Sequence, residues 1–331
     1  MTSIANYLYF TVANGTFYFS LRGKWQQLDA RWFQILFLAS FLALGALARD
    51  FALTREQVLL TFASALLTQA AWQWGLNLPG KRKWSGYLST IISSFGICIL
   101  VRAETAWVHP LLACVAMSSK YLIRGGPSTV KSHLLNPANL AAFAAFAWVP
   151  GAWLSPGQWG SDSLAALWFV ALGGLVTQRI SRWDVSLGFL AAWASLLGLR
   201  LWLLDYAWVP GAAMWLQQAS NGAVLLFAFF MISDPMTTPQ RRAVRIAYAV
   251  GVALLAFGWQ FLLFKPHGLI VILFLASWTV PLWNSLWPQR RFDWGAMHPM
   301  AFASKITRQG DATPGRPPRC RTPLGVNWRL P

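Results

Sequence analysis

The stretch Phe229-Phe230-Met231-Ile232-Ser233-Asp234-Pro235-Met236-Thr237-Thr238-Pro239 decides how the rest of the chain is interpreted. It begins as the end of a long apolar segment, and it then becomes polar and acidic and is interrupted by two prolines. A carboxylate beside an apolar segment of membrane length is costly unless it faces protein, water or a ligand. We therefore expect Asp234 to lie at an interior site.

The composition of the chain is that of a membrane protein. The sequence has 331 residues, of which 56% are hydrophobic and only 11% are charged, and it contains 21 Trp. Soluble domains carry roughly 25% charged residues. Trp residues are enriched where a helix meets the membrane–water interface. The fold class expected from this composition is an all-α polytopic membrane protein.

Ten apolar stretches have about the 20 residues that a helix needs to cross a bilayer. They predict a transmembrane domain over residues 31–287. Residues 1–30 are rich in aromatic side chains and are expected to form an interfacial, partly helical cytoplasmic segment. Residues 288–331 are rich in Pro and Arg and are expected to be a disordered cytoplasmic tail. The predicted spans are 32–48, 57–75, 85–102, 105–121, 138–154, 162–177, 184–204, 212–232, 243–264 and 268–286.

The formal net charge of +17 supports this topology. If the N-terminus is cytoplasmic, fourteen Lys and Arg fall on the cytoplasmic side before the tail, five fall on the other side, and the tail adds eight. This asymmetry predicts ten spans with both termini in the cytoplasm, in a bacterial inner membrane. Because the cations lie in short loops between apolar spans, we expect contact with anionic lipid and no nucleic-acid partner.

A second polar stretch, Asn136-Pro137-Ala138-Asn139, matches the first. The two polar–Pro pairs are 98 residues apart, and the predicted spans around them repeat at a similar offset. An internal repeat with Pro-interrupted segments at matching positions points to a central site in transporter-like folds. There, the freed N-terminus of a half-helix favours an anion. Alternatively, both breaks are surface turns that Asn136 and Asp234 cap.

Further candidates for ligand contact lie close to these two stretches. Lys120 and Arg124 are suited to a phosphate, although the topogenic charge of a loop explains them equally. His133 is suited to an anion or a quinone, and its alternative is a loop residue in water. The sequence carries no recognisable catalytic motif or metal-ligand spacing. The candidate cofactor-binding residues are Lys120, Arg124, His133, Asn136, Pro137, Ser233, Asp234, Pro235, Thr237 and Thr238.

The order of four motifs resembles a known family. Leu28-Asp29-Ala30-Arg31-Trp32-Phe33-Gln34 comes first, followed by the region of Lys120, then by Leu135-Asn136-Pro137-Ala138, and last by Phe230-Met231-Ile232-Ser233-Asp234-Pro235. Over residues 28–290 the chain resembles the RnfD/NqrB family, whose members are membrane subunits of the Rnf electron-transport complex and of the sodium-pumping NADH:quinone oxidoreductase. The resemblance implies ten helices with an internal inverted repeat, related to urea and ammonium channels. It also implies a place among other membrane redox subunits.

Two features depart from this family. Its redox members carry FMN covalently on a Thr after the fifth span, whereas residues 155–163 here contain Ser155, Ser161 and Ser163 but no Thr. This departure argues against covalent FMN and leaves non-covalent FMN, riboflavin or a quinone. In addition, four predicted spans separate the two matching motifs, whereas an inverted repeat needs an odd number. Either a re-entrant half-helix is hidden among the ten spans or one span is miscounted, and region 120–137 is the suspect.

Three functional hypotheses follow from these features. The first is a membrane subunit of an electron-transport or ion-coupled redox system, acting as scaffold or conduit. The second is a channel or transporter for a small solute on the same fold. The third is a membrane protein that handles or exports the apolar product of a biosynthetic cluster. The missing Thr favours the second and third hypotheses relative to the first.

Overall fold

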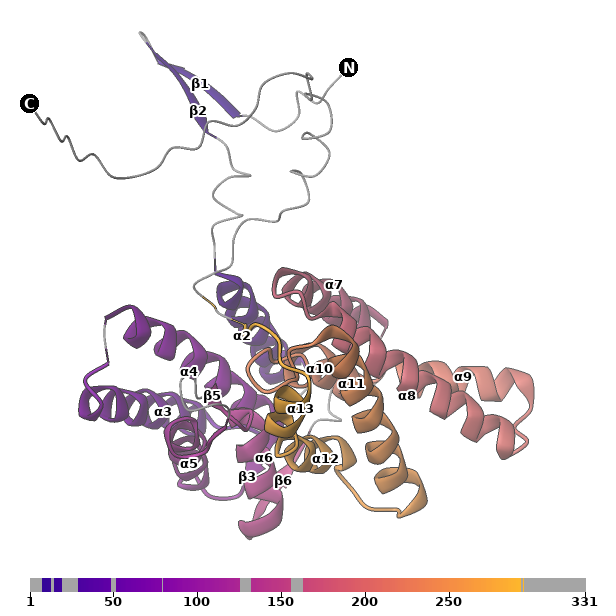
Figure 1. Ribbon diagram of the computed structural model, residues 1–331. Coiled ribbons are helices and arrows are strands. Elements are labelled where there is room, and N and C mark those ends of the chain that lie inside the picture. The colour runs from indigo at the N-terminus through magenta and orange to yellow at the C-terminus, as the bar shows by residue number, and fades with distance from the viewer. Residues whose placement is uncertain are drawn as a thin grey trace, which may run out of the picture. The chain divides into compact units, whose positions relative to one another are not determined.

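The chain folds mainly into α-helices, which Figure 1 shows in chain order. The computed structural model describes residues 8–12, 15–19, 29–48, 52–78, 80–125, 132–155, 163–292 and 294. The chain divides into two units, one made of residues 1–28 and 296–331 and the other of residues 29–295. In the first unit the described residues form a hairpin. The predicted tail beyond residue 294 and most of residues 155–163 lie outside the described residues.

The hairpin replaces the partly helical segment that the sequence predicts near the N-terminus. Strand β1 (Leu8–Val12) pairs antiparallel with β2 (Gly15–Phe19). Tyr, Phe, Thr and Val fill these strands, and such aromatic and β-branched residues favour extended backbone. Asn14-Gly15 is also a dipeptide that favours a tight hairpin connection. The preference of the local residues for strand therefore outweighs the general helical character of the chain.

The second unit contains the helices. The first half comprises α2 (Ala30–Ala48), α3 (Arg55–Gly75), α4 (Gly80–Leu100), α5 (Val108–Leu122) and α6 (Pro137–Trp148). The second half comprises α7 (Ser163–Arg179), α8 (Trp183–Leu203), α9 (Trp208–Ala219), α10 (Gly222–Leu226), the π-helix η2 (Phe227–Met231), α11 (Arg242–Phe257), the π-helix η3 (Gly258–Leu262), α12 (Gly268–Ser277) and α13 (Val280–Leu286).

Short strands join some of these helices. Strand β3 (Val101–Ala103) pairs with β6 (Ala152–Leu154), and β4 (Arg124–Gly125) pairs with β5 (Ser132–His133). The predicted span 138–154 therefore ends early, because the chain turns at Gly151 with a φ of +72° and continues as β6. The predicted span 212–232 is likewise interrupted, since Asn221 caps a new helix at Gly222. Segments predicted as uniform helices are thus broken by local turn chemistry.

Length and apolar composition identify three helices able to cross a membrane among the described residues. They are residues 30–47, 183–203 and 242–262, and α12 with α13 forms a fourth if the pair, bent by 47°, is one span. Residues 84–100, 164–179 and 222–231 form shorter apolar helices. These helices are those of a membrane protein, whereas the expectation of ten spans and a repeat stays a prediction.

Helix α3 explains why the count by composition is low. With 21 residues it is about 31 Å long, which is enough to cross a bilayer. Its inner face, however, carries polar side chains at multiples of four residues, which lie on one side of a helix. These side chains are buried within the protein: Gln57, Thr61, Gln69 and Gln73. The exposed side of α3 carries leucines such as Leu59 and Leu67 instead.

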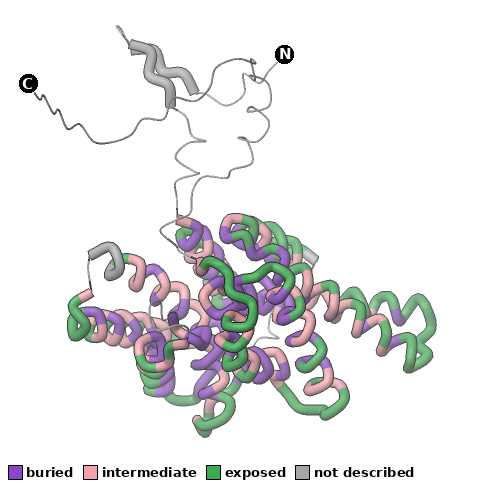
Figure 2. The backbone as a smooth tube through the Cα atoms, in the orientation of Figure 1, coloured by how far each residue is buried: buried purple, intermediate pink, exposed green. Residues whose placement is uncertain are grey.

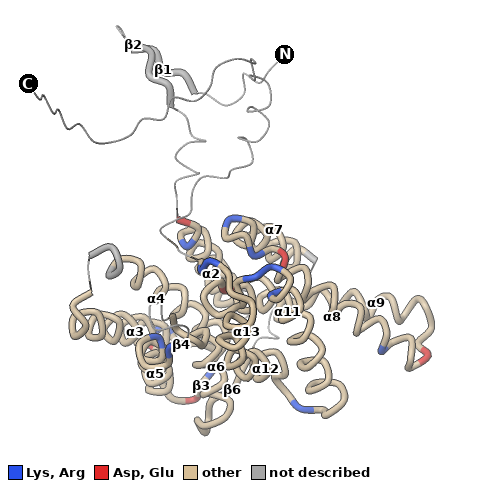
Figure 3. The backbone as a smooth tube through the Cα atoms, viewed as in Figure 1, with Lys and Arg blue, Asp and Glu red and all other residues tan. Residues whose placement is uncertain are grey.

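The two halves of the helical unit pack in a similar way. In the first half α3 packs against α5, α2 against α4, and α5 against α6. In the second half α8 packs against α11, α7 against α10 and η2, and α11 against α12. Figure 2 shows the buried residues concentrated where the two halves meet, while α9 is largely exposed. Lys and Arg gather around the start of α2, the end of α7 and the start of α11 (Figure 3).

Candidate functional site

A cavity of about 670 Å³ lies within the helical unit, at the end where these cations gather. Residues of α2, α4, α5, α6 and η2 line it, together with residues from the loops that precede α6 and follow η2. Eight of the ten predicted site residues are on its wall: Lys120, Arg124, His133, Asn136, Pro137, Ser233, Asp234 and Pro235. Thr237 and Thr238 are buried behind the loop and are not on the wall.

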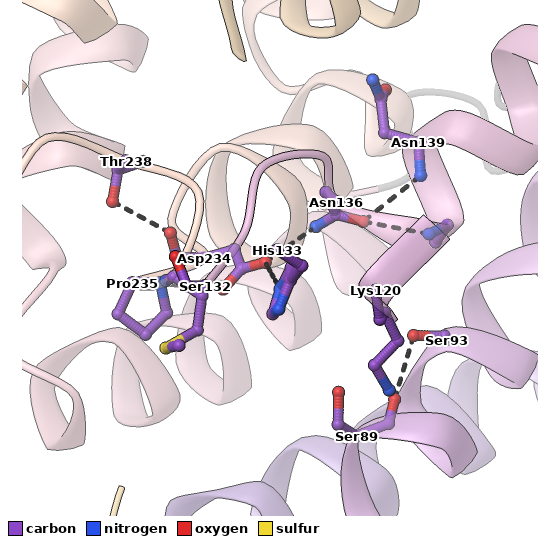
Figure 4. A network of polar contacts seen from close by, with 12 residues as sticks. Ser89, Ser93, Lys120, Ser132, His133, Asn136, Asn139, Asp234, Pro235 and Thr238 are labelled. Carbon is purple, nitrogen blue, oxygen red and sulfur yellow. Dashed lines mark hydrogen bonds and ion pairs between the residues drawn. The ribbon is translucent and has the colours of Figure 1, made fainter. Parts of the chain in front are cut away.

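The two matching sequence motifs meet at this cavity. The side-chain amide of Asn136 donates to Asp234 Oδ2 at 3.4 Å, and His133 Nε2 lies 4.0 Å from the same oxygen. Figure 4 shows the three side chains pointing toward one another. A contact between residues so far apart in the sequence brings the two halves of the helical unit together at one site.

Asn136 does two things at once. Its Oδ1 accepts from the backbone N–H groups of Ala138 and Asn139 at 3.1 and 3.2 Å, and Pro137 occupies the first helical position. This is the usual chemistry of a helix N-terminus, so the simple capping interpretation holds for this residue. Because the cap uses only the oxygen, the amide N–H₂ remains available to Asp234.

The second break has a different local structure. The Oδ1 atom of Asp234 accepts from the Met236 N–H at 3.0 Å, and the Asp234 carbonyl accepts from the Thr238 hydroxyl at 2.9 Å. Helix α11 begins only at Arg242, so Asp234 turns a loop and caps no helix. The expectation that both breaks are equivalent helix starts is therefore wrong in its local detail.

Contacts around Asp234 stabilise its charged form. Burial raises the pKa of the Asp234 carboxyl. The hydrogen bond and the charge of His133 lower it, as do hydrogen bonds from the Met236 N–H and the Thr237 hydroxyl, and the resulting pKa lies below the ordinary value of Asp. Asp234 is therefore a carboxylate at neutral pH, held beside the cavity.

A buried arginine, which the sequence analysis did not single out as a site residue, holds the loop of Asp234 in place. Arg182 is 2% exposed and donates to the carbonyl of Pro239 at 3.1 Å and to Gln240 Oε1 at 2.8 Å. The side-chain amide of Gln240 in turn donates to the Pro235 carbonyl at 3.0 Å. Burial and the charge of Arg245 lower the pKa of Arg182 to about 10, so its guanidinium stays charged at neutral pH.

The segment that follows α13 completes the wall. Trp294 lines the cavity, and the Arg31 guanidinium lies 4.6 Å from the centre of its ring. The Phe292 N–H donates to Gln240 Oε1 at 3.1 Å, and Arg291 hydrogen-bonds the Ser132 hydroxyl. The sequence predicts disorder from residue 288, yet these contacts attach residues 291–294 to the loops of the site. Aromatic and cationic side chains within the tail were the available signal.

Further polar residues of the wall come from helix faces. Ser85, Ser89 and Ser93 follow at four-residue intervals on α4, and Gln69 of α3 donates to the Tyr121 hydroxyl. Their regular spacing within apolar segments could have revealed them in the sequence. Within the described residues, no three His, Cys, Asp or Glu side chains are grouped so as to hold a metal ion. The cavity therefore offers hydrogen-bond donors, cations and aromatic rings to an organic ligand.

Comparisons with known proteins agree with the motifs. Residues 143–293 match the NQR2, RnfD, RnfE family. The ion-translocating oxidoreductase complex protein RnfD of Stutzerimonas stutzeri is 29% identical over 146 residues, which cover 44% of this chain and 38% of the relative. The protein of the same name from Escherichia coli O1:K1 is 31% identical over 147 residues, which cover 44% of this chain and 36% of the relative.

The matched region contains the loop of Asp234 but begins after Asn136. The match spans little more than a third of the length of these relatives. The resemblance inferred from the motifs is thereby confirmed for residues 143–293, which carry the sequence signature of the NQR2, RnfD, RnfE family.

Proposed function

We propose that this chain is a membrane subunit of an ion-translocating redox system and that its cavity binds a flavin or a quinone non-covalently. The observation that carries this proposal is the contact of Asn136 with Asp234 on the wall of the 670 Å³ cavity. The half of the contact that Asp234 supplies lies within the family match. Relatives named as subunits of an ion-translocating oxidoreductase complex support a role beside other membrane redox subunits in a bacterial inner membrane.

The residues on the wall fit such a ligand. A volume of this size lies within the usual range of roughly 300–1,000 Å³ for small-molecule sites. Phe229, Phe230 and Trp294 offer aromatic surface to a ring system, while Asn136 and His133 offer polar contacts at its edge. A bound flavin would supply the ability to accept and pass on electrons. The protein would supply binding, orientation and the fixed charge of Asp234.

We also propose that the helical unit is an inverted repeat of five helices in each half. The similar packing in the two halves supports this, because α2, α3, α5 and α6 correspond to α7, α8, α11 and α12. Helix α4 then corresponds to the broken segment formed by α9, α10 and η2. An offset of five crossings inverts the second half, whereas the offset of four between Asn136 and Asp234 compares positions that are not equivalent.

The absorption spectrum of the purified protein tests the first proposal. The full chain is extracted in mild detergent, and its flavin content is measured between about 350 and 500 nm, with quinone extraction in parallel. A flavin or quinone near one per chain, lost in Asp234→Ala and Asn136→Ala variants that still insert into the membrane, is the expected result. A colourless protein without quinone would contradict it.

A pathway for a small solute is the second candidate. The buried polar face of α3 favours it, because Gln57, Thr61, Gln69 and Gln73 run along the length of the helix. Polar side chains buried at membrane depth commonly mark a substrate or ion pathway. Solute uptake into liposomes that contain the purified chain, reduced by Gln69→Leu, would favour this function over the first.

A further inference from the structure

Lys120 is a buried cation on the cavity wall. Its side chain is 8% exposed, and its contacts among the described residues are Gln69 Oε1 at 3.4 Å and Met117 Sδ at 3.9 Å. An ammonium group has three N–H donors, and both of these contacts are long. Because a buried charge is costly without an opposite charge or several hydrogen bonds, Lys120 lacks much of the stabilisation that its position requires.

The other charged groups that line the described part of the cavity already have partners. Arg31 forms an ion pair with Asp29 and donates to the Ser85 hydroxyl at 2.8 Å. Arg124 is exposed and donates backwards to the Lys120 carbonyl at 3.2 Å. Asp234 is occupied by contacts from its own loop and from His133. The charge of Lys120 is therefore the one available to a ligand.

Hydroxyl groups surround the end of the Lys120 side chain. Figure 4 shows this side chain extending toward Ser89 and Ser93 of α4. The Ser93 hydroxyl donates to the Ser89 carbonyl at 2.9 Å, whereas the Ser89 hydroxyl is free to donate to a ligand. The Tyr121 oxygen accepts from Gln69, which leaves the Tyr121 O–H available as a donor as well. The corner formed by Lys120, Ser89 and Tyr121 is thus rich in donors and carries a positive charge.

We propose that this corner binds a phosphate monoester, so that the flavin of the cavity is FMN rather than riboflavin. The inference rests on the proposed function, because it requires a flavin in the cavity. An ammonium with neighbouring hydroxyls matches the several acceptor oxygens and the negative charge of a phosphate. Riboflavin and quinones lack such a charge and leave Lys120 unpaired. The phosphate site is therefore formed by Lys120 with α4, and not by Lys120 with Arg124 as the sequence suggests.

Flavin binding to the purified full-length protein, measured by quenching of flavin fluorescence, tests this inference. The ligand-depleted protein in detergent is titrated separately with FMN and with riboflavin at physiological ionic strength. The wild type is expected to bind FMN at least about tenfold more tightly, the effect of one hydrogen-bonded charge in a desolvated site. Lys120→Met should abolish this preference by weakening FMN binding alone, and Lys120→Arg should retain part of it. Lys265→Met removes an exposed cation elsewhere and should change neither affinity.

The possible outcomes separate the two proposals. Equal affinities for FMN and riboflavin in the wild type, unchanged in Lys120→Met, would overturn the phosphate site and leave the flavin cavity standing. Loss of both ligands in Lys120→Met, with a normal elution profile in size-exclusion chromatography, would also overturn it, because the lysine would then not discriminate the phosphate. Binding of neither flavin by the wild type would refute the phosphate site together with flavin binding in the cavity.

Discussion

Replacement of Arg182 by Met is expected to destabilise the loop that carries Asp234. Arg182 comes directly before α8 and contacts the loop at Pro239, at Gln240 and, with a long bond of 3.4 Å, at Pro235. Met fills a similar volume but donates no hydrogen bond. The variant therefore removes the charge and the three donated bonds while keeping the space filled.

The magnitude of the effect follows from what each acceptor retains. Gln240 Oε1 keeps the Phe292 N–H, and the Pro235 carbonyl keeps the Gln240 amide. Only the Pro239 carbonyl loses its one hydrogen bond within the described part of the chain. Two good bonds from a charged donor, each contributing about 1.5–3 kcal/mol, give a loss of roughly 3–5 kcal/mol in the free energy of unfolding.

Thermal unfolding in detergent, followed by intrinsic Trp fluorescence, measures this loss. For a chain of this size it corresponds to a decrease in melting temperature of roughly 5–15 °C. Arg242→Gln is the matched control, because Arg242 is 63% exposed and its partner Asp184 keeps Arg245. An exposed ion pair of this kind contributes little. Equal melting temperatures for wild type and Arg182→Met would show that Arg182 does not hold the loop.

Three further predictions concern pH, packing and topology. The lowered pKa of Asp234 stabilises the fold above the unfolded value of Asp, and this contribution is lost as the pH falls through the lower folded pKa; melting curves between about pH 5 and 3 should therefore fall less steeply for Asp234→Asn, and parallel curves would contradict this. Gly173→Ala places a methyl group 2.6 Å from Phe229 Cβ and should cost roughly 1–3 kcal/mol, whereas Gly174→Ala meets nothing within 4 Å and should be neutral in the same melting assay. In a cysteine-free background, Lys265→Cys should react with an impermeant maleimide from outside the cell, whereas a cysteine at the start of α11 should react only after permeabilisation; labelling of both in intact cells would refute the predicted topology.

Much of the candidate site was predictable because its chemistry conflicts with its surroundings. Asn136 and Asp234 stand out as polar residues beside prolines in an apolar chain, and both line the cavity. Lys120 was recognisable as a cation near the first motif, but the sequence paired it with Arg124. The structure separates them, because the α5 helix buries Lys120 while Arg124, four residues further along, is exposed in β4.

Other parts of the site could not be read from local patterns. Arg182 looks like one more topogenic cation in a loop, and only the packing of that loop against residues 235–240 gives it a role. Residues 291–294 look like the start of a disordered tail, yet Trp294 reaches Arg31 at the far end of the chain. Such roles depend on contacts between distant segments, which no periodicity records.

The sequence by itself determined the class of this protein, the composition of its helices, the two polar breaks and the family signature of residues 143–293. These properties are local, because apolar length, proline and capping residues act within a few positions of the chain. The tertiary structure decided that Asn136 and Asp234 face each other across one cavity, that Lys120 lacks a carboxylate partner there, and that α3 turns its glutamines inward. The physical reason is that burial and charge pairing are set by which helices pack together, and the stretch around Asp234 acquires its neighbours only when the two halves meet.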